Sequence, residues 1–331
     1  MLGIDSVNES DLLDRLRRIA TAPEARGLLD DVAVLDGLVV SHDSIAEGVH
    51  FLPADPPASV GWKLVAVNLS DLAGKGVQPA AAILSLTISG ESEWEEHFLI
   101  GVEAACETYA LPLIGGDTIA LPLGALRVLG MTVIGRAGES VPERSGGKPR
   151  DALWVVGTIG DAAAGLKALI ADRSATGPLV EIYRRPIPQL SAGQAIAPHA
   201  HAMMDVSDGL LIDSKRLARA SGLNASIELD RLPLSKAFIA ELGDSLNSRL
   251  FAATGGDDYA LLAALASDLD PSTLSLPQGT RMTRVGSLSE GEAGVSLTSG
   301  GKPVELPERL GFEHSGDKHR GPSDPPMADR P

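Results

Sequence analysis

The sequence predicts a mixed α/β fold organised as two domains. The chain has 331 residues, and a length of this order corresponds to two domains more often than to one. Apolar runs of strand length alternate with longer segments of helical periodicity. Residues 136–150 are rich in glycine, proline and charge and contain few apolar side chains, as is typical of a domain junction. Periodicity alone leaves the order of the strands open.

The first half of the chain contains helical and strand signals in alternation. Asn8 is a suitable cap for a helix over residues 11–20, where leucines recur at helical spacing. Asp36-Gly37 separates two short apolar runs and is a strong signal for a two-residue hairpin turn. The expected strands are 32–35, 38–41, 80–88 and 126–134, and the further expected helices are 60–73 and 92–110.

The second half repeats this alternation. We expect strands over residues 153–156 and 260–264 and helices over residues 162–171 and 208–220. Residues 314–331 are polar and rich in proline, so we expect a disordered tail. The predicted division is an N-terminal domain over 1–137, a linker over 138–150 and a C-terminal domain over 151–313.

The composition argues against several classes of function. The formal net charge is −16 and aromatic residues make up only 3%, whereas sequence-independent binding of nucleic acid requires a basic surface and stacking platforms. Cys106 is the only cysteine, which excludes an intramolecular disulfide and a zinc site built from several cysteines. No apolar run approaches the ~20 residues of a membrane span, and residues 1–10 lack the pattern of a signal peptide. We therefore expect a cytoplasmic protein with no nucleic-acid or membrane partner.

Aspartates recur beside glycine, serine and apolar residues at the ends of the predicted elements. They are Asp30, Asp31, Asp43, Asp71, Asp117, Asp205, Asp208, Asp257 and Asp258. Taken singly, such an aspartate is typical of a turn or a helix cap. Taken together, carboxylates that converge on one pocket would repel one another strongly unless cations neutralised them. Mg²⁺ suits oxygen ligands of this kind and would let an acidic protein bind an acidic substrate such as ATP.

Several familiar phosphate-binding and nucleophile motifs are missing. Around Gly74-Lys75 the first glycine and the final serine or threonine of a Walker A loop are replaced by Leu69 and Gly76. The sequence also contains neither a kinase-type glycine-rich loop nor a G-x-S-x-G nucleophile elbow. Covalent catalysis by a hydroxyl group therefore has no support in the sequence.

Six motifs follow one another between residues 30 and 312. They are DDVAVL at 30–35, SHDSIAEGVHF at 41–51, KLVAVNLSDLA at 63–73, GGDT at 115–118, DVSDGL at 205–210 and GGDDY at 255–259. In this order and over this length they resemble the thiamine-monophosphate kinase family, which belongs to the aminoimidazole ribonucleotide synthetase-like superfamily. The segments 47–51 and 68–71 favour this branch over others of the superfamily.

The resemblance implies a two-domain synthetase-like fold, with N-terminal domains that form a homodimer through a sheet or barrel and a C-terminal α/β domain. It implies phosphorylation of thiamine monophosphate to thiamine diphosphate, with ATP as co-substrate and several Mg²⁺ ions, as the last step of thiamine diphosphate biosynthesis. Direct in-line transfer through a loose transition state requires positioning and charge neutralisation more than a protein nucleophile. The alternatives are another ATP-using enzyme of the superfamily and a non-catalytic homologue that binds Mg²⁺ and nucleotide.

The resemblance also implies roles for individual residues. The implied metal-binding residues are Asp31, Ser41, His42, Asp43, Asp71, Asp117, Asp205 and Asp208. The implied ATP contacts are Gly116, Asp117, Arg144 and Ser207. The implied contacts to thiamine monophosphate are His50, Asp257 and Phe312. A guanidinium fork such as that of Arg144 suits a phosphate, and the Phe312 ring suits a cationic thiazolium.

Three positions depart from the family pattern. His42 stands where the family usually has threonine; imidazole is a poor Mg²⁺ ligand, although a backbone carbonyl at this position would still serve. Lys75 stands where an apolar residue is usual, which we interpret as a surface adaptation. Arg150 stands where glycine is common, which makes the conformation of that loop harder to predict.

Overall fold

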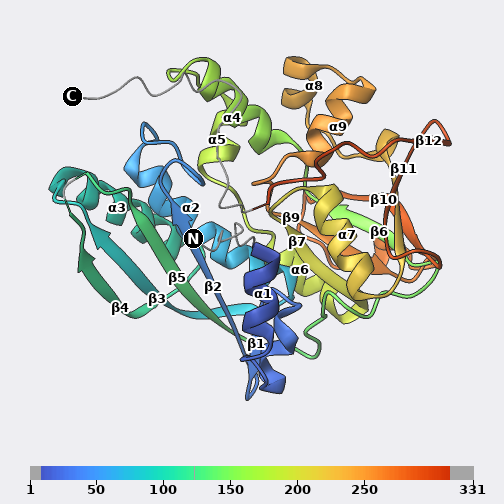
Figure 1. Cartoon of the computed structure of the whole chain (residues 1–331), viewed down its shortest axis with the longest axis horizontal. Coiled ribbons are helices and arrows are strands. Elements are labelled where there is room, and N and C mark those ends of the chain that lie inside the picture. Colours follow the sequence, from blue (N-terminus) through green and yellow to red (C-terminus); the bar gives the residue numbers. More distant parts are fainter. Residues whose placement is uncertain (1–8, 123, 314–331) are drawn as a thin grey trace, which may run out of the picture.

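The computed structural model describes residues 9–122 and 124–313, and it folds them around two open sheets. One sheet has five strands and the other seven. Figure 1 shows the first of them on the left, the second on the right and helix α2 between them. The Asn8 cap and the tail over 314–331 lie outside the described residues. None of the described helices is long and apolar enough to cross a membrane. The domain limits at 137 and 151 stay a prediction, with the second sheet beginning at Ala152.

The first sheet has the strand order β1-β2-β5-β3-β4. Its strands are β1 (Ala33–Leu35), β2 (Leu38–Ala46), β3 (Gln78–Ile88), β4 (Leu113–Ala120) and β5 (Val128–Arg136), and its helices are α1 (Glu9–Arg17), α2 (Pro57–Gly74) and α3 (Ser92–Thr108), with a 3₁₀ segment η1 (Pro23–Leu28). The hairpin predicted at Asp36-Gly37 is confirmed, because Leu35 pairs with Leu38 and both turn residues have positive φ, as a type I′ turn requires.

Strand β4 was not predicted, because its Gly115-Gly116-Asp117 sequence is typical of a turn. It is the edge strand of the sheet and runs parallel to β3. A Cβ atom at Gly116 would lie 2.3 Å from the carbonyl oxygen of Leu84. Glycine at this position therefore permits a close approach of two strands rather than a turn.

Helix α2 is buried on nearly every side. It packs on α3 and on the first sheet, and it also contacts α6 (Leu190–Ile196), β7 (Ala200–Val206) and β9 (Ala260–Leu265) of the second half. Its buried residues include polar ones, among them Lys63, Asn68 and Asp71. Buried polar groups require partners, so the polar residues of this helix must find them at the junction between the two sheets.

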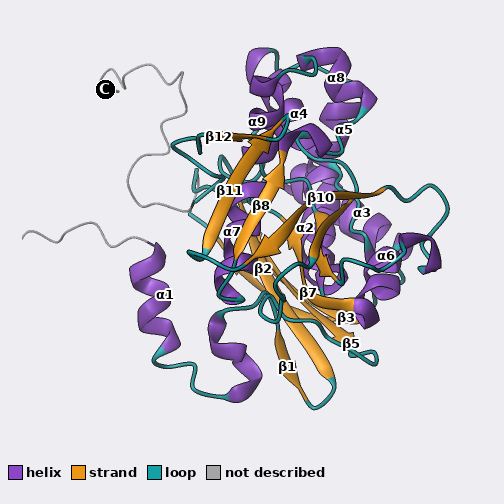
Figure 2. Cartoon of the chain, turned by 90° about the vertical axis from the view of Figure 1, so that its right-hand side faces the viewer, coloured by secondary structure: helices purple, strands orange, loops and turns teal. Residues whose placement is uncertain are grey.

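The second sheet has the strand order β12-β11-β8-β10-β6-β9-β7. Its remaining strands are β6 (Ala152–Val156), β8 (Asn224–Glu228), β10 (Met282–Ser289), β11 (Gly294–Ser299) and β12 (Lys302–Val304), and the helices around it are α4 (Asp161–Ala171), α5 (Pro178–Arg184), α7 (Leu210–Ala220), α8 (Lys236–Leu242) and α9 (Leu246–Thr254). Figure 2 shows α8 and α9 together above the upper end of strands β8 and β11. Within this sheet the pair β8–β11 is parallel and the other described pairs are antiparallel.

Candidate metal and nucleotide site

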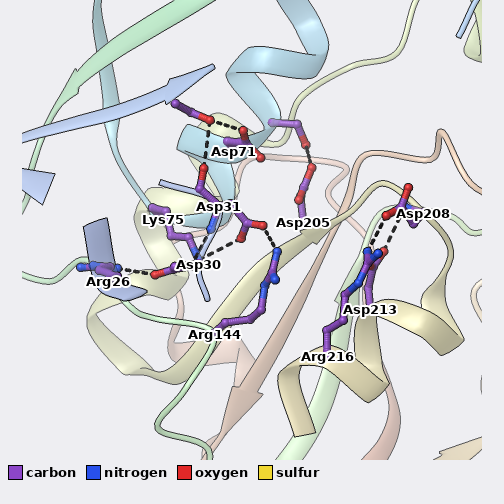
Figure 3. Close-up of polar contacts among 12 residues, drawn as sticks. Arg26, Asp30, Asp31, Asp71, Lys75, Arg144, Asp205, Asp208, Asp213 and Arg216 are labelled. Carbon is purple, nitrogen blue, oxygen red and sulfur yellow. Dashed lines mark hydrogen bonds and ion pairs between the residues drawn. The ribbon is translucent and has the colours of Figure 1, made fainter. Parts of the chain in front are cut away.

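Three carboxylates from distant parts of the chain meet where the two halves of the molecule touch. Asp31 precedes β1, Asp71 lies in α2 and Asp205 lies near the end of β7. One oxygen of each carboxylate lies within 4.8 Å of the others, and Figure 3 shows the three side chains pointing toward one another. The close approach depends on Gly74 in α2, where a Cβ atom would lie 2.8 Å from the backbone nitrogen of Asp205.

Neighbouring hydroxyl and amide groups fix this arrangement. Ser41 Oγ hydrogen-bonds the Asp71 carboxylate and lies 3.0 Å from the carbonyl oxygen of Asp31. Ser70 Oγ donates to Asp205 Oδ2 at 2.6 Å. Asn68 accepts a 2.8 Å hydrogen bond from the backbone N–H of Asp43, which ties β2 to α2. Asn68 and Asp71 lie three residues apart in α2, so they share a face of the helix, and this face points into the site.

Burial and mutual repulsion raise the pKa values of most of these carboxyl groups. Burial, together with the charges of Asp31 and Asp208, raises the pKa of Asp43 to about 6. Burial also raises the pKa values of Asp71 and Asp205 well above the usual range, and neighbouring aspartates add to the shift. Buried acids that are this costly to ionise fit a site where a divalent cation replaces the protons.

The opposite side of the cluster already has cations supplied by the chain. Burial by itself would raise the pKa of Asp31, but Arg144 and Lys75 outweigh it and lower the pKa to about 2. The Lys75 ammonium pairs with Asp30 and lies 3.2 Å from Asp31 Oδ2, and Arg26 pairs with Asp30 at 2.6 Å. Figure 3 shows this chain of alternating charges.

The interpretation of Lys75 as a surface adaptation is wrong. Its side chain is completely buried, and the ammonium also donates to the carbonyl oxygen of Met203 in β7 at 2.9 Å. Arg144, which the resemblance implies as an ATP contact, bonds the carboxylate of Asp31. Both cations therefore lie at the cluster rather than in solvent.

A second acidic group lies at the start of α7. Arg216 pairs with Asp208 and lies 2.8 Å from Asp213. Burial raises the pKa of Asp213 to about 6, although Arg216 opposes the shift. The sequence analysis did not identify Asp213 as a site residue. The available signal was its position three residues before Arg216 on a predicted helix, a spacing that favours an ion pair.

A pocket of about 350 Å³ opens between the two halves beside these carboxylates. Its lining includes the predicted residues Asp43, His50, Ser207, Asp208, Asp257 and Phe312. Residues expected to contact metal, ATP and thiamine monophosphate thus lie around one cavity. The backbone N–H of Phe312 donates to the carbonyl oxygen of Asp208 at 2.9 Å, which holds the C-terminal segment against the pocket.

Lys63 lies behind this pocket and is a further polar residue to which the sequence analysis gave no role. Its ammonium donates to Asp257 Oδ2 at 2.7 Å and to the carbonyl oxygen of His50 at 2.8 Å. It also lies 4.1 Å from the centre of the Tyr183 ring. Tyr259 donates its hydroxyl to the other oxygen of Asp257 at 3.0 Å. The orientation of Asp257 is therefore fixed from two sides.

Three predicted residues do not join the cluster within this chain. The His42 side chain lies on the opposite face of β2 from Ser41 and Asp43, where Nδ1 lies 2.9 Å from Thr132 Oγ1. Gly116 and Asp117 lie on the exposed edge strand β4. The strand register leads from Asp117 across β3 and β5 to Ser44 in β2. Asp117 therefore lies three strand spacings, about 14 Å, from β2.

Comparisons with known proteins place both halves of the chain in one group. Residues 29–137 match the N-terminal domain, and residues 148–295 the C-terminal domain, of AIR synthase related proteins. The chain is 37% identical to thiamine-monophosphate kinase of Caulobacter vibrioides over 92% of this chain and 90% of that protein. It is 36% identical to the enzyme of the same name from Salmonella typhimurium, over 91% and 95%.

Solved structures agree with these relatives. AaThiL complexed with AMPPCP and TMP matches with a TM-score of 0.80 and 30% identity, covering 93% of this chain and 97% of that one. Thiamine monophosphate kinase from Aquifex aeolicus matches with a TM-score of 0.77 and 31% identity, over 90% and 97%. The hydrogenase maturation protein HypE in complex with ATP, at 18% identity and a TM-score of 0.66, shares the fold.

Proposed function

Because this chain belongs to the thiamine-monophosphate kinase family of AIR synthase related proteins, we propose that it transfers the γ-phosphoryl group of ATP to thiamine monophosphate. The products are ADP and thiamine diphosphate. The observation that carries this proposal is the buried carboxylate cluster of Asp31, Asp71 and Asp205 beside a pocket lined by both halves of the chain. The proposed compartment is the cytoplasm, where ATP is available as co-substrate.

The donor set fits several Mg²⁺ ions. Asp71 and Asp205 are buried, Asp43 is partly buried, and all three have raised pKa values with no described cationic side chain close enough to prevent the shift. We propose that these three, with Asp31 and Asp208, hold the metal. Bound Mg²⁺ supplies charge neutralisation to the phosphate groups of both substrates, which would otherwise repel each other.

The chain's own residues contribute binding and orientation. Asp257, fixed by Lys63 and Tyr259, places a carboxylate in the pocket, where it suits the positive charge of a thiazolium ring. Phe312 lines the same pocket and offers a ring for that cation to pack on. Arg144 stands beside Asp31, from where its guanidinium can also reach a phosphate oxygen. Holding two substrates in line accounts for much of the catalysis of such a transfer.

We further propose that the protein is a homodimer paired through the first sheet. Among the described helices, α2 packs on one face of this sheet and α3 packs on α2. The other face and the β4 edge expose apolar side chains, which are Ile83, Leu113, Ile114, Ile119 and Val128. Asp117 lies on the same uncovered face, about 14 Å from β2 by strand spacing. In the dimer, Asp117 would serve the metal and nucleotide site of the second copy.

The deciding experiment measures ADP release with Mg²⁺-ATP and a choice of acceptors. We expect turnover with thiamine monophosphate and none with free thiamine. We expect Asp71→Asn to lower kcat at least ~100-fold, because one missing carboxylate weakens stabilisation of the transition state. The matched control is Asp172→Asn, on an exposed turn after α4, which should leave kcat unchanged.

Two outcomes would contradict the proposal. Turnover only with formylglycinamidine ribonucleotide would indicate another enzyme of the superfamily. Tight binding of Mg²⁺-ATP without turnover on any acceptor would indicate a non-catalytic homologue.

The thermal stability of Asp71→Asn separates loss of function from loss of fold. Because it removes a buried acid that is costly to ionise, the metal-free variant should unfold at no lower temperature than the unmodified protein.

A further inference from the structure

A second and larger cavity lies in the C-terminal half, away from the proposed catalytic pocket. Its volume is about 750 Å³, within the range of sites for cofactors and metabolites. It is formed by β6, β10, the segment from the 3₁₀ turn η3 (Leu229–Arg231) to α9 and the loop that follows β9. No residue lines both this cavity and the pocket beside the carboxylate cluster.

The cavity is basic, although the chain as a whole is strongly acidic. Its lining contains four arginines, Arg231, Arg249, Arg281 and Arg284, against two aspartates, Asp230 and Asp244. The net charge of the whole chain is −16, so this excess of positive charge is a local feature. An anion entering the cavity would be attracted to it.

Part of this basic wall is held in place by the chain. Arg281 donates to the carbonyl oxygen of Leu234 at 3.0 Å. Arg249 donates to the carbonyl oxygen of Leu229 at 2.7 Å and pairs with Asp244 at 2.6 Å. Guanidinium groups fixed in this way lose less conformational entropy when they bind a ligand.

Two neighbouring side chains of the cavity have buried donors without partners. Trp154 in β6 and Arg284 in β10 are direct partners in the strand register, so their side chains lie on the same face of the sheet. Among the described residues, neither the Trp154 Nε1 atom nor the Arg284 Nε atom has a hydrogen-bond partner. Trp62, in contrast, donates its Nε1–H to the carbonyl oxygen of Pro186 at 3.0 Å. Unpaired buried donors are rare and costly, and a bound acceptor toward which these two side chains turn would satisfy them.

The rest of the lining is mostly apolar. Leu232, Leu234, Ile239, Leu269, Pro271 and Met282 lie next to the indole of Trp154, and Ser267 and Thr283 are the polar exceptions. Ile239 is partly exposed, so a ligand could cover it. A flat ring suits this surface, because aromatic and apolar side chains pack favourably against one.

We propose that this cavity binds a second ligand, an organic phosphate that carries a ring. The ring packs against Trp154 and the leucines, and the phosphate accepts hydrogen bonds from Arg281 and Arg284. This site is separate from the catalytic pocket and takes no part in phosphoryl transfer. Both products of the proposed reaction, ADP and thiamine diphosphate, have the required chemistry and serve as probes.

The test follows the indole N–H of Trp154 by nuclear magnetic resonance. The chain has three tryptophans, so ¹⁵N-indole labelling gives three resonances, and Trp154→Phe identifies the relevant one. ADP, thiamine diphosphate and inorganic phosphate are titrated separately in EDTA, which withholds metal from the catalytic site. We expect the Trp154 resonance to shift with at least one ring-bearing phosphate at lower concentration than with inorganic phosphate. The Trp62 resonance is the internal control, because its N–H is already bonded.

A pair of arginine variants makes the assignment specific. Arg284→Met removes the guanidinium next to Trp154 and should weaken binding of the probe about tenfold, as expected for the loss of one charge-assisted hydrogen bond. Arg219→Met, on the exposed side of α7, should leave binding unchanged. The proposal is wrong if the Trp154 resonance responds to none of the probes, if inorganic phosphate binds as tightly as both ring-bearing probes, or if Arg284→Met binds like the unmodified protein.

Discussion

Replacing Lys75 by methionine should destabilise the metal-free protein strongly. The Lys75 ammonium is completely buried and contacts the carboxylates of Asp30 and Asp31 and the carbonyl oxygen of Met203. Removing one partner of a buried ion pair costs about 3–5 kcal/mol, because the other charge stays buried without compensation. Methionine keeps most of the side-chain volume, so a packing defect adds little.

The remaining cations place the expected loss at the lower end of that range. Arg26 still pairs with Asp30, and Arg144 with Asp31, so neither carboxylate is left without a positive neighbour. We therefore expect the free energy of unfolding to fall by about 3 kcal/mol. Urea unfolding at pH 7.5, in EDTA and then in saturating Mg²⁺, measures this loss and its recovery.

Lys63→Met is the matched control, because Lys63 is likewise a buried lysine, within α2, and it pairs with one aspartate. Asp257, its partner, is not in the carboxylate cluster. Mg²⁺ should therefore restore a larger share of the lost stability in Lys75→Met than in Lys63→Met. A loss below about 0.5 kcal/mol in Lys75→Met, the range of ordinary surface substitutions, would refute the argument that this ammonium compensates the buried aspartates.

Three further predictions concern the metal and the dimer. The pKa of Asp43 is raised from 3.8 to about 6, so its contribution to metal-free stability, about 3 kcal/mol, is present below pH ~4 and is lost as the pH rises through 6. The gain in Tm on adding Mg²⁺ should therefore grow between pH 5 and pH 7; a constant gain would contradict the metal role. Asp117→Asn and Asp71→Asn subunits should each form inactive dimers. In an equal mixture after subunit exchange, half of the dimers are mixed and each has one intact site, so about a quarter of the activity should return. No recovery would place both residues in the site of one chain. His42→Thr should leave the half-saturating Mg²⁺ concentration within about twofold, since the side chain faces away from the cluster; a larger change would contradict that placement.

Local signals predicted the parts of the fold that local chemistry determines. The hairpin at Asp36-Gly37 follows from a dipeptide that accepts two positive φ angles. Helices α2 and α3 follow from long runs of helical periodicity. Strand β4 was missed because Gly116 is needed for the close approach to the carbonyl oxygen of Leu84. Leu84 is distant in sequence, so no local pattern shows this contact. The short helices around the second sheet, such as α5 and α8, were missed because a single apolar turn carries little periodicity.

The candidate site, like the fold, could be predicted from the sequence only in part. The carboxylates Asp31, Asp71 and Asp205 could be named from sequence motifs, and the structure brings their side chains together. The surroundings of Lys75 could not be foreseen, because a lysine beside glycines is typical of an exposed helix end. It is buried because α2 packs between two sheets, and no local pattern shows that both of its faces are covered.

In the part that the structure describes, the chain supplies cations to one side of the carboxylate cluster and none to the other. Asp31 is held ionised by Lys75 and Arg144, with a pKa of about 2, so its side of the cluster is ordered with or without metal. Asp71 and Asp205 have no cation of the chain bonded to them among the described residues, and hydroxyl groups of Ser41 and Ser70 orient them instead. The chain thus fixes the positions of all three carboxylates but neutralises only one. Metal binding therefore has to displace protons rather than rearrange the backbone, so Mg²⁺ affinity should rise with pH over the range in which the raised carboxyls ionise.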